Sequence, residues 1–219
     1  MTIHPLRRSF VPAVALFAIA ATLVLLAACT ALKGNLPQEP GLHPRLTRFT
    51  YLEEGKLVSF AVDTAATRKR EDAPYVPFGI AVANMSLPRL TLTRESFTLV
   101  DDKGQRSSLA TIQQARELAG LTVYDLRLSQ DFFDVMFTRF SAWPFTQAVF
   151  FPVQSPAGGD PEISRRGIVR ERVELPVHSW TRDVIYFPHP EGQLMGRRYE
   201  MWLDTEELED PIFVKFEVK

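Results

Sequence analysis

The chain has 219 residues and a formal net charge of −1, with 25 basic and 26 acidic side chains. This balance gives no general electrostatic attraction to nucleic acid or to anionic lipid, so we expect no nucleic-acid partner. A hydrophobic content of 46% excludes a mostly disordered chain.

The first 28 residues have the three-part layout of a secretory signal peptide. Arg7 and Arg8 form a basic start, an apolar run follows over residues 11–26, and small residues close the run before Cys29. A small-residue cleavage site after a short apolar run is typical of a signal peptide and not of a membrane-spanning helix. We therefore expect residues 1–28 to be removed.

The stretch Leu26-Ala27-Ala28-Cys29 resembles the lipobox of bacterial lipoproteins. The resemblance implies that the Cys29 sulfur carries a lipid such as palmitate, and several acyl chains make a lasting membrane anchor. Thr30 follows the cysteine, whereas Asp at that place signals retention in the inner membrane, so the resemblance favours the outer membrane. Cys29 is the only cysteine, so lipidation leaves no thiol for a disulfide or for catalysis.

Residues 29–48 are expected to form a lipidated, Pro-rich tether before a domain over 49–219. No apolar period runs through this segment, and turn-forming residues interrupt it repeatedly. These are Gly34, Asn35, Pro37, Pro40, Gly41 and Pro44. An extended tether of this kind spans about 50 Å. The alternative is a tail that packs partly on the domain.

From residue 49 onward, short β-rich runs separated by turn signals predict an antiparallel β-sandwich. The strands are expected at 57–62, 76–84, 90–93, 97–100, 122–128, 146–153, 168–175, 183–187, 199–203 and 212–218. In the second of these, the small residues Gly79, Ala81 and Ala83 share one face, which leaves room for a closely packed helix. Four apolar residues of the last strand, Ile212, Val214, Phe216 and Val218, alternate regularly and are expected to point inward.

A mostly helical insertion is expected over residues 107–143. Helix formers over 111–119 end at Gly120, which would cap the helix, and Thr122 to Leu128 is predicted as a strand inside the insertion. A second helix over 129–140 would begin at Ser129, a residue type favoured as an N-cap. Its apolar stripe consists of Phe132, Phe133, Met136, Phe137 and Phe140.

Residues 76–104 resemble the immunoglobulin-like (telokin-like) domains found in many bacterial lipoproteins of unknown function. The resemblance rests on Val82-Ala83-Asn84-Met85-Ser86, Leu90-Thr91-Leu92, Ser96-Phe97-Thr98-Leu99-Val100-Asp101 and Gly104. In that family a strand ends in Asn and a small polar residue, and a later strand reads Phe-x-Leu-x-Asp before a Gly turn. The resemblance implies an immunoglobulin-like fold.

The sequence contains no pattern that predicts a catalytic or metal centre. Nucleophile elbows, zinc-ligand spacings and phosphate-binding glycine loops are absent. His43 lies in the expected tether, and His178 and His189 flank one predicted strand; none of them matches a ligand spacing, and solvated turn histidines are expected. We therefore expect neither a cofactor nor an enzyme.

Two sets of residues are candidates for binding a partner. Arg165, Arg166, Arg170 and Arg172 form a basic cluster that would contact phosphate or carboxylate groups, the alternative being a solvated sheet edge. Phe133 and Phe137 belong to an aromatic segment that is either an exposed surface for a partner or a lid packed on the sheet.

The predicted function is that of a non-enzymatic, lipid-anchored outer-membrane protein that serves as a binding or structural module for another envelope component. One alternative is a carrier or chaperone for an apolar ligand held beneath the aromatic helix. An enzyme is the third reading.

Overall fold

The computed structural model describes residues 39–111, 114, 119–140, 147–148 and 172–219. All of them belong to one contact unit, Leu36–Lys219. The signal peptide, Cys29, Arg165, Arg166 and Arg170 lie outside the described residues. Within the described ranges, no helix is both long and apolar enough to cross a membrane.

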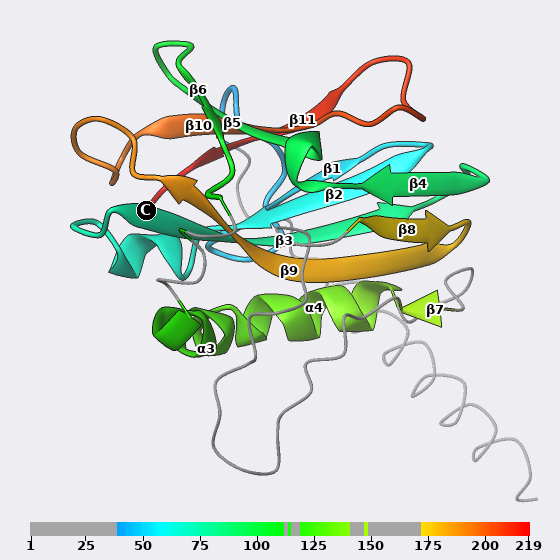
Figure 1. Cartoon of the computed structure of the whole chain (residues 1–219), viewed down its shortest axis with the longest axis horizontal. Coiled ribbons are helices and arrows are strands. Elements are labelled where there is room, and N and C mark those ends of the chain that lie inside the picture. Colours follow the sequence, from blue (N-terminus) through cyan, green and yellow to red (C-terminus); the bar gives the residue numbers. More distant parts are fainter. Residues whose placement is uncertain (1–38, 112–113, 115–118, 141–146, 149–171) are drawn as a thin grey trace, which may run out of the picture. The chain divides into compact units, whose positions relative to one another are not determined.

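The described strands form two packed sheets and a strand pair, in the layers seen in Figure 1. The five-stranded sheet has the order β1 (Thr50–Glu54), β2 (Val58–Asp63), β3 (Tyr75–Asn84), β9 (Ser179–Pro188) and β7 (Gln147–Ala148). The four-stranded sheet has the order β11 (Ile212–Glu217), β10 (Arg198–Leu203), β5 (Phe97–Asp101) and β6 (Arg106–Ser108). The pair consists of β4 (Arg89–Leu92) and β8 (Val173–Pro176). All pairings are antiparallel except that of β7 with β9, so the predicted antiparallel sandwich is confirmed.

The main hydrophobic core fills the space between the two large sheets. Phe78, Ile80 and Val82 of β3 point into it from one sheet. Val214 and Phe216 of β11 point into it from the other, while Phe213 before them and Lys215 between them are only partly buried. The predicted alternation of the last strand is confirmed, and Val218 continues it past the end of β11.

Helices α3 (Ala119–Leu128) and α4 (Gln130–Phe140) cover the outer face of the five-stranded sheet (Figure 1). A second core lies between them and the sheet, and Ala81 and Ala83 belong to it. A Cβ atom added to Gly79 would lie 3.1 Å from Cδ1 of Phe132. The expectation that this small-residue face accepts a closely packed helix is confirmed.

The prediction of a strand over Thr122 to Leu128 is wrong, because these residues lie in α3. Gly120 likewise lies inside α3 and does not cap a preceding helix. Asp125 and Ser129 are buried, and they precede the buried residues of α4 at helical spacing. A tertiary contact pattern of this kind overrides β-propensity, which depends strongly on context.

Ser129 joins α3 to α4 without capping α4 through its side chain. Its N–H donates to the Asp125 carbonyl at 3.0 Å, and its own carbonyl accepts from the Phe133 N–H at 3.0 Å. These bonds carry the helical pattern across the junction. The Ser129 hydroxyl is buried without a hydrogen-bond partner among the described residues, so the predicted helix start is confirmed but its side-chain cap is not.

The C-terminal part of the expected tether packs on the sandwich. Leu42 is buried in the main core. The His43 N–H donates to the Lys215 carbonyl at 2.9 Å, and the Leu52 N–H donates to the Pro44 carbonyl at 2.9 Å. The alternative of a packed tail therefore describes residues 39–48. The chain between Cys29 and Glu39 spans about 35 Å when fully extended.

Candidate partner-binding site

Three large hydrophobic side chains are exposed at one end of the described structure. Leu57 is 44% exposed, Phe137 50% and Val177 43%. We call these three residues the apolar end. Tyr124, 48% exposed, is the fourth large hydrophobic side chain exposed among the described residues, and it lies on α3.

Hydrogen bonds between neighbouring turns bring Leu57 and Val177 to the same end of the five-stranded sheet. Leu57 lies in the turn between β1 and β2, and its carbonyl accepts from the Met85 N–H at 2.9 Å. Val177 lies in the turn between β8 and β9, where the His178 N–H donates to the Asn84 carbonyl at 2.9 Å. Since Asn84 and Met85 are adjacent, the two turns flank one loop.

Phe137 approaches the same end from the helical layer. Its ring centroid lies 6.3 Å from that of Trp180, at the start of β9. Two residues later in α4, the Arg139 guanidinium pairs with the Glu54 carboxylate at the end of β1. Figure 1 shows the C-terminal end of α4 beneath the turn between β8 and β9.

The turn between β8 and β9 is unusual in its residues. His178 has φ of 56°, and it is the only non-glycine residue with positive φ in the described ranges. Gly is the usual residue at such positions, and His is among the few other types enriched there. The sequence analysis placed Leu57 at the start of the strand 57–62, whereas β2 begins at Val58, and it did not single out Val177.

The structure separates the two aromatic candidates. Phe133 is buried, and the Arg182 guanidinium lies 4.6 Å above its ring. Phe132, Met136 and Phe140 are buried with it in the second core. The interpretation of a packed lid therefore holds for these residues. Its extension to Phe137 is wrong, because this side chain lies at the border of the buried stripe and faces outward.

Of the predicted arginine cluster, only Arg172 lies within the described residues. It precedes β8, is largely exposed, and forms an ion pair with Glu174 at 3.2 Å. This geometry is that of a solvated strand border.

The three histidines lie in separate places, and no group of three His, Cys, Asp or Glu side chains in the described ranges is arranged to hold a metal ion. His43 is the most constrained of them. Its Nδ1 accepts from the Lys215 N–H at 2.7 Å, and its Nε2 lies 3.0 Å from Glu53. Burial lowers the pKa of His43, while Glu53 opposes this shift. Because Nδ1 accepts the Lys215 N–H, the ring is neutral with its proton on Nε2.

A shallow groove of about 310 Å³ runs beside His43. It is lined by Gly41, Leu42, His43, Pro44, Phe213 and Lys215. Phe213 stacks on Trp202 with ring centroids 4.8 Å apart, and the Lys215 ammonium lies 2.7 Å from Glu200. Small-molecule sites commonly enclose about 300–1,000 Å³, so the groove is at the lower limit.

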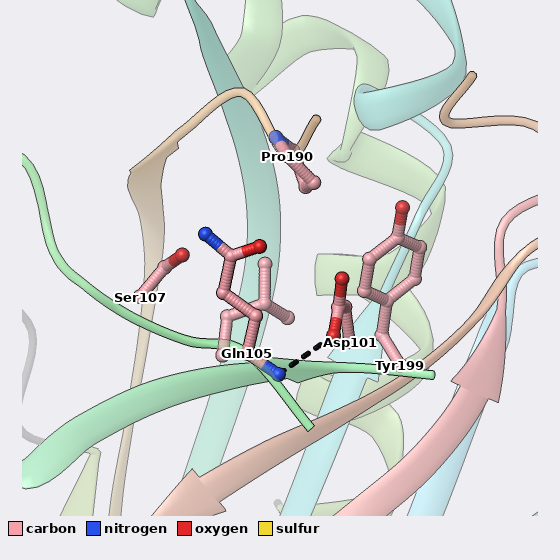
Figure 2. Close-up of a pocket in the computed structure, with 6 residues that line it drawn as sticks. Asp101, Gln105, Ser107, Pro190 and Tyr199 are labelled. Carbon is pink, nitrogen blue, oxygen red and sulfur yellow. Dashed lines mark hydrogen bonds between the residues drawn. The ribbon is translucent and has the colours of Figure 1, made fainter. Parts of the chain in front are cut away.

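A much smaller pocket lies at the start of β10, and Figure 2 shows its lining. It encloses only about 10 Å³ for the centre of a water molecule. The residues around it are Leu99, Asp101, Gln105, Ser107, Pro190 and Tyr199. A space of this size holds one water molecule and no organic substrate.

Two buried carboxyl groups form hydrogen bonds within the fold: that of Asp125 in the helical layer and that of Asp63 at the end of β2. Asp125 of α3 accepts from the Tyr186 hydroxyl at 3.0 Å and pairs with Arg70 at 3.0 Å. Burial raises the pKa of Asp125, and the bonds from Tyr186 and Arg70 oppose this shift. Since all of its partners belong to the fold, Asp125 holds α3 on β9.

Asp63 lies at the end of β2 and is almost fully buried. Its two carboxyl oxygens accept from the Thr50 hydroxyl at 2.9 Å and from the Ala65 N–H at 3.1 Å. Burial, with a smaller contribution from the charge of Asp131 on α4, raises the pKa of Asp63 to about 7, while the hydrogen bonds from Thr50 and Ala65 oppose this shift. These bonds give the carboxyl group a structural role.

No protein-family model, no curated protein and no solved structure matches this chain.

Proposed function

We propose that this chain is a lipid-anchored protein of the bacterial outer membrane whose immunoglobulin-like domain binds another envelope protein without catalysis. Acyl groups on Cys29 supply the anchor, and the apolar end supplies the contact with the partner. The proposal is supported mainly by three exposed hydrophobic side chains, which come from two turns and a helix and lie at one end of the fold.

The position of the N-terminal segment supports this arrangement. Glu39, the first described residue, pairs with Arg45 at 3.1 Å and with Lys219. The chain therefore joins the domain beside its C-terminus, and Figure 1 shows the C-terminus at the opposite end from the turn between β8 and β9. An anchor attached there leaves the apolar end accessible to a partner.

The immunoglobulin-like assignment is supported by Asn84, which ends β3 in the motif that carries the resemblance. Its side-chain amide donates to the carbonyls of Leu87 and Leu175, both at 2.9 Å, and its Oδ1 accepts from the Leu87 N–H at 2.9 Å. A buried Asn with these bonds joins β3, the following turn and β8. Gly104 has φ of 81°, as the predicted turn after β5 requires.

The groove beside His43 offers no unpaired general base among its lining residues. A general base needs an open acceptor nitrogen near a substrate. Both ring nitrogens of His43 already have partners in the fold, and the Lys215 ammonium is paired with Glu200.

Two experiments test the proposal separately. Cys29→Ser in the full chain should abolish fatty-acid labelling and release the protein from membranes, whereas continued membrane partitioning would refute the anchor. A Leu57→Ser, Val177→Ser double variant should stay folded but lose its partner on co-purification from solubilised envelopes. Tyr124→Ser is the matched control, because Tyr124 is equally exposed away from the apolar end. Equal loss in the control would refute the assigned surface.

A further inference from the structure

Strand pairing gathers several loops at the end of the fold opposite the apolar end. Thr50 at the start of β1 is the register partner of Asp63 at the end of β2, so the residues before β1 and after β2 lie together there. The hydroxyl of Tyr51 donates to the Glu217 carbonyl at 3.1 Å, which brings the end of β11 to the same place. Arg198, at the start of β10, is the register partner of Glu217.

Basic side chains without a carboxylate partner collect at this end. Within the described ranges, those that form no ion pair are Arg48, Arg68, Lys69, Lys103 and Arg198. We call these residues the basic end. All of them are exposed except Arg68, which is half-buried. The acidic residues of the same loops that form no ion pair are fewer: Glu71, Asp72 and Glu191.

Two members of the basic end share one aromatic ring. The guanidinium of Arg68 lies 4.7 Å from the centroid of Phe49, and that of Arg48 lies 5.4 Å from it. The Phe49 carbonyl accepts from the Thr64 N–H at 3.0 Å, which fixes the ring beside the loop after β2. Contact with a ring does not neutralise a cation, and two neighbouring cations repel each other. An anionic surface in front of them would relieve that repulsion.

The loop between β10 and β11 has the opposite charge and lies at the opposite end. Leu203 and Ile212 are register partners, so residues 204–211 project away from Arg198, and Figure 1 shows this loop on the side away from the C-terminus. Its Glu207 carboxylate accepts from the Thr91 N–H at 3.2 Å, which places the loop on β4. The acidic side chains of this loop that form no ion pair in the described part of the chain are Asp204, Glu206, Glu209 and Asp210.

This separation of charge would orient the molecule beside a charged surface. The near-neutral total of the chain conceals it, because a surface acts only on charges within a Debye length, about 8 Å at physiological salt. An anionic surface attracts the basic end and repels the acidic loop. The N-terminal segment enters at the basic end, where Glu39 pairs with Arg45 and Lys219. An anchor on Cys29, about 35 Å of extended chain away, keeps the basic end within reach of the bilayer, so a weak attraction suffices.

We propose that the basic end docks on the anionic phosphate headgroups of the membrane that holds the anchor, so that the apolar end points away from the bilayer. The proposal rests on the lipid anchor of the proposed function and on no particular protein partner.

Energy transfer to labelled lipid headgroups tests the orientation. Because Cys29 is the only cysteine and the proposed lipid occupies it, an introduced cysteine is the single free thiol. The full-length lipidated chain carries a fluorophore on Pro74→Cys, in the loop before β3, or on Ser86→Cys, beside the apolar end; both positions are exposed. It is reconstituted in vesicles of phosphatidylethanolamine and phosphatidylglycerol with an acceptor-labelled headgroup. Transfer should be stronger from position 74, and this difference should vanish at about 1 M salt, where the Debye length is about 3 Å.

An Arg48→Gln, Arg68→Gln double variant then tests the residues themselves. Each arginine beside an anionic surface contributes a factor of about five, so the ratio of docked to undocked molecules should fall roughly 25-fold. Arg89→Gln with Arg172→Gln is the matched control, since it removes the same charge from strand borders near the apolar end and should leave transfer from position 74 unchanged.

Equal transfer from positions 74 and 86, a difference that persists at high salt, or equal effects of the two double variants would overturn the proposal. Flotation of the same samples with the vesicles separates this failure from that of the anchor. A chain that does not float refutes the lipid anchor and the docking together, whereas a chain that floats with equal transfer from both positions refutes the docking alone.

Discussion

Replacing Asp63 by Asn should make the protein more stable at pH 8 and remove much of its pH dependence. The carboxyl group is 2% exposed and lies where β2 pairs with Gly79 of β3. An amide fits the same bonds, since its nitrogen can donate to the Thr50 hydroxyl and its oxygen can accept from the Ala65 N–H. The Thr50 hydroxyl can in turn donate to Thr47, whose hydroxyl lies 2.9 Å away.

The direction follows from the pKa of Asp63, which rises from 3.8 to about 7 on folding, chiefly because of burial. A raised carboxyl pKa means that the folded state favours the protonated form. The associated stability is fully present below pH 3.8 and is lost as the pH rises through about 7. One pKa unit corresponds to about 1.36 kcal/mol, so the difference between the pH extremes is about 4 kcal/mol.

Urea unfolding of both proteins between pH 4 and 8 measures this difference. The free energy of unfolding of the unmodified protein should fall with rising pH relative to that of Asp63→Asn, and the two should converge near pH 4. Asp210→Asn, at an exposed position, is the matched control and should follow the unmodified protein. Parallel curves for Asp63→Asn and the unmodified protein would refute the reasoning.

The other predictions concern packing. Phe132→Ala should lower the free energy of unfolding by about 3–5 kcal/mol. Phe137→Ala should lower it by less than about 1 kcal/mol, because the Phe137 ring is half exposed. A larger loss for Phe137→Ala than for Phe132→Ala in urea unfolding would contradict the assigned helix face. Deleting residues 212–219 should unfold the domain, because Val214, Phe216 and Val218 each contribute roughly 1.5–3 kcal/mol by burial, which together approaches the whole stability of a domain. A cooperative thermal transition of the truncated chain at the unmodified temperature would contradict this.

The parts of the fold that could be predicted are those in which apolar or small residues recur with a regular spacing in the sequence. The inward side chains of β11 are apolar at every second position, and the small residues of β3 identified the face that α4 covers. The error at α3 arose because the helical stripe there contains the polar residues Asp125 and Ser129. Their burial depends on Arg70 and Tyr186, which are distant in sequence, so no local pattern shows it.

The candidate site was less predictable, because it is assembled from three separate segments. The sequence analysis named Phe137 as a candidate, but the helical periodicity placed it in the packed stripe. A residue at the border of such a stripe can be either buried or exposed, and periodicity does not distinguish the two. Leu57 and Val177 become notable only when strand pairing brings their turns together. Tyr199 and Asp101 meet for the same reason, as register partners on β10 and β5.

Site-specific photo-crosslinking in intact cells tests the central claim most directly. A photoreactive amino acid is placed in turn at positions 57, 137 and 177 of the apolar end, and at position 124 as the exposed control. The proposed function predicts one common protein adduct from the first three positions, identified by mass spectrometry, and none from position 124. Adducts of equal yield from position 124, or no adduct from any position of the apolar end, would contradict it.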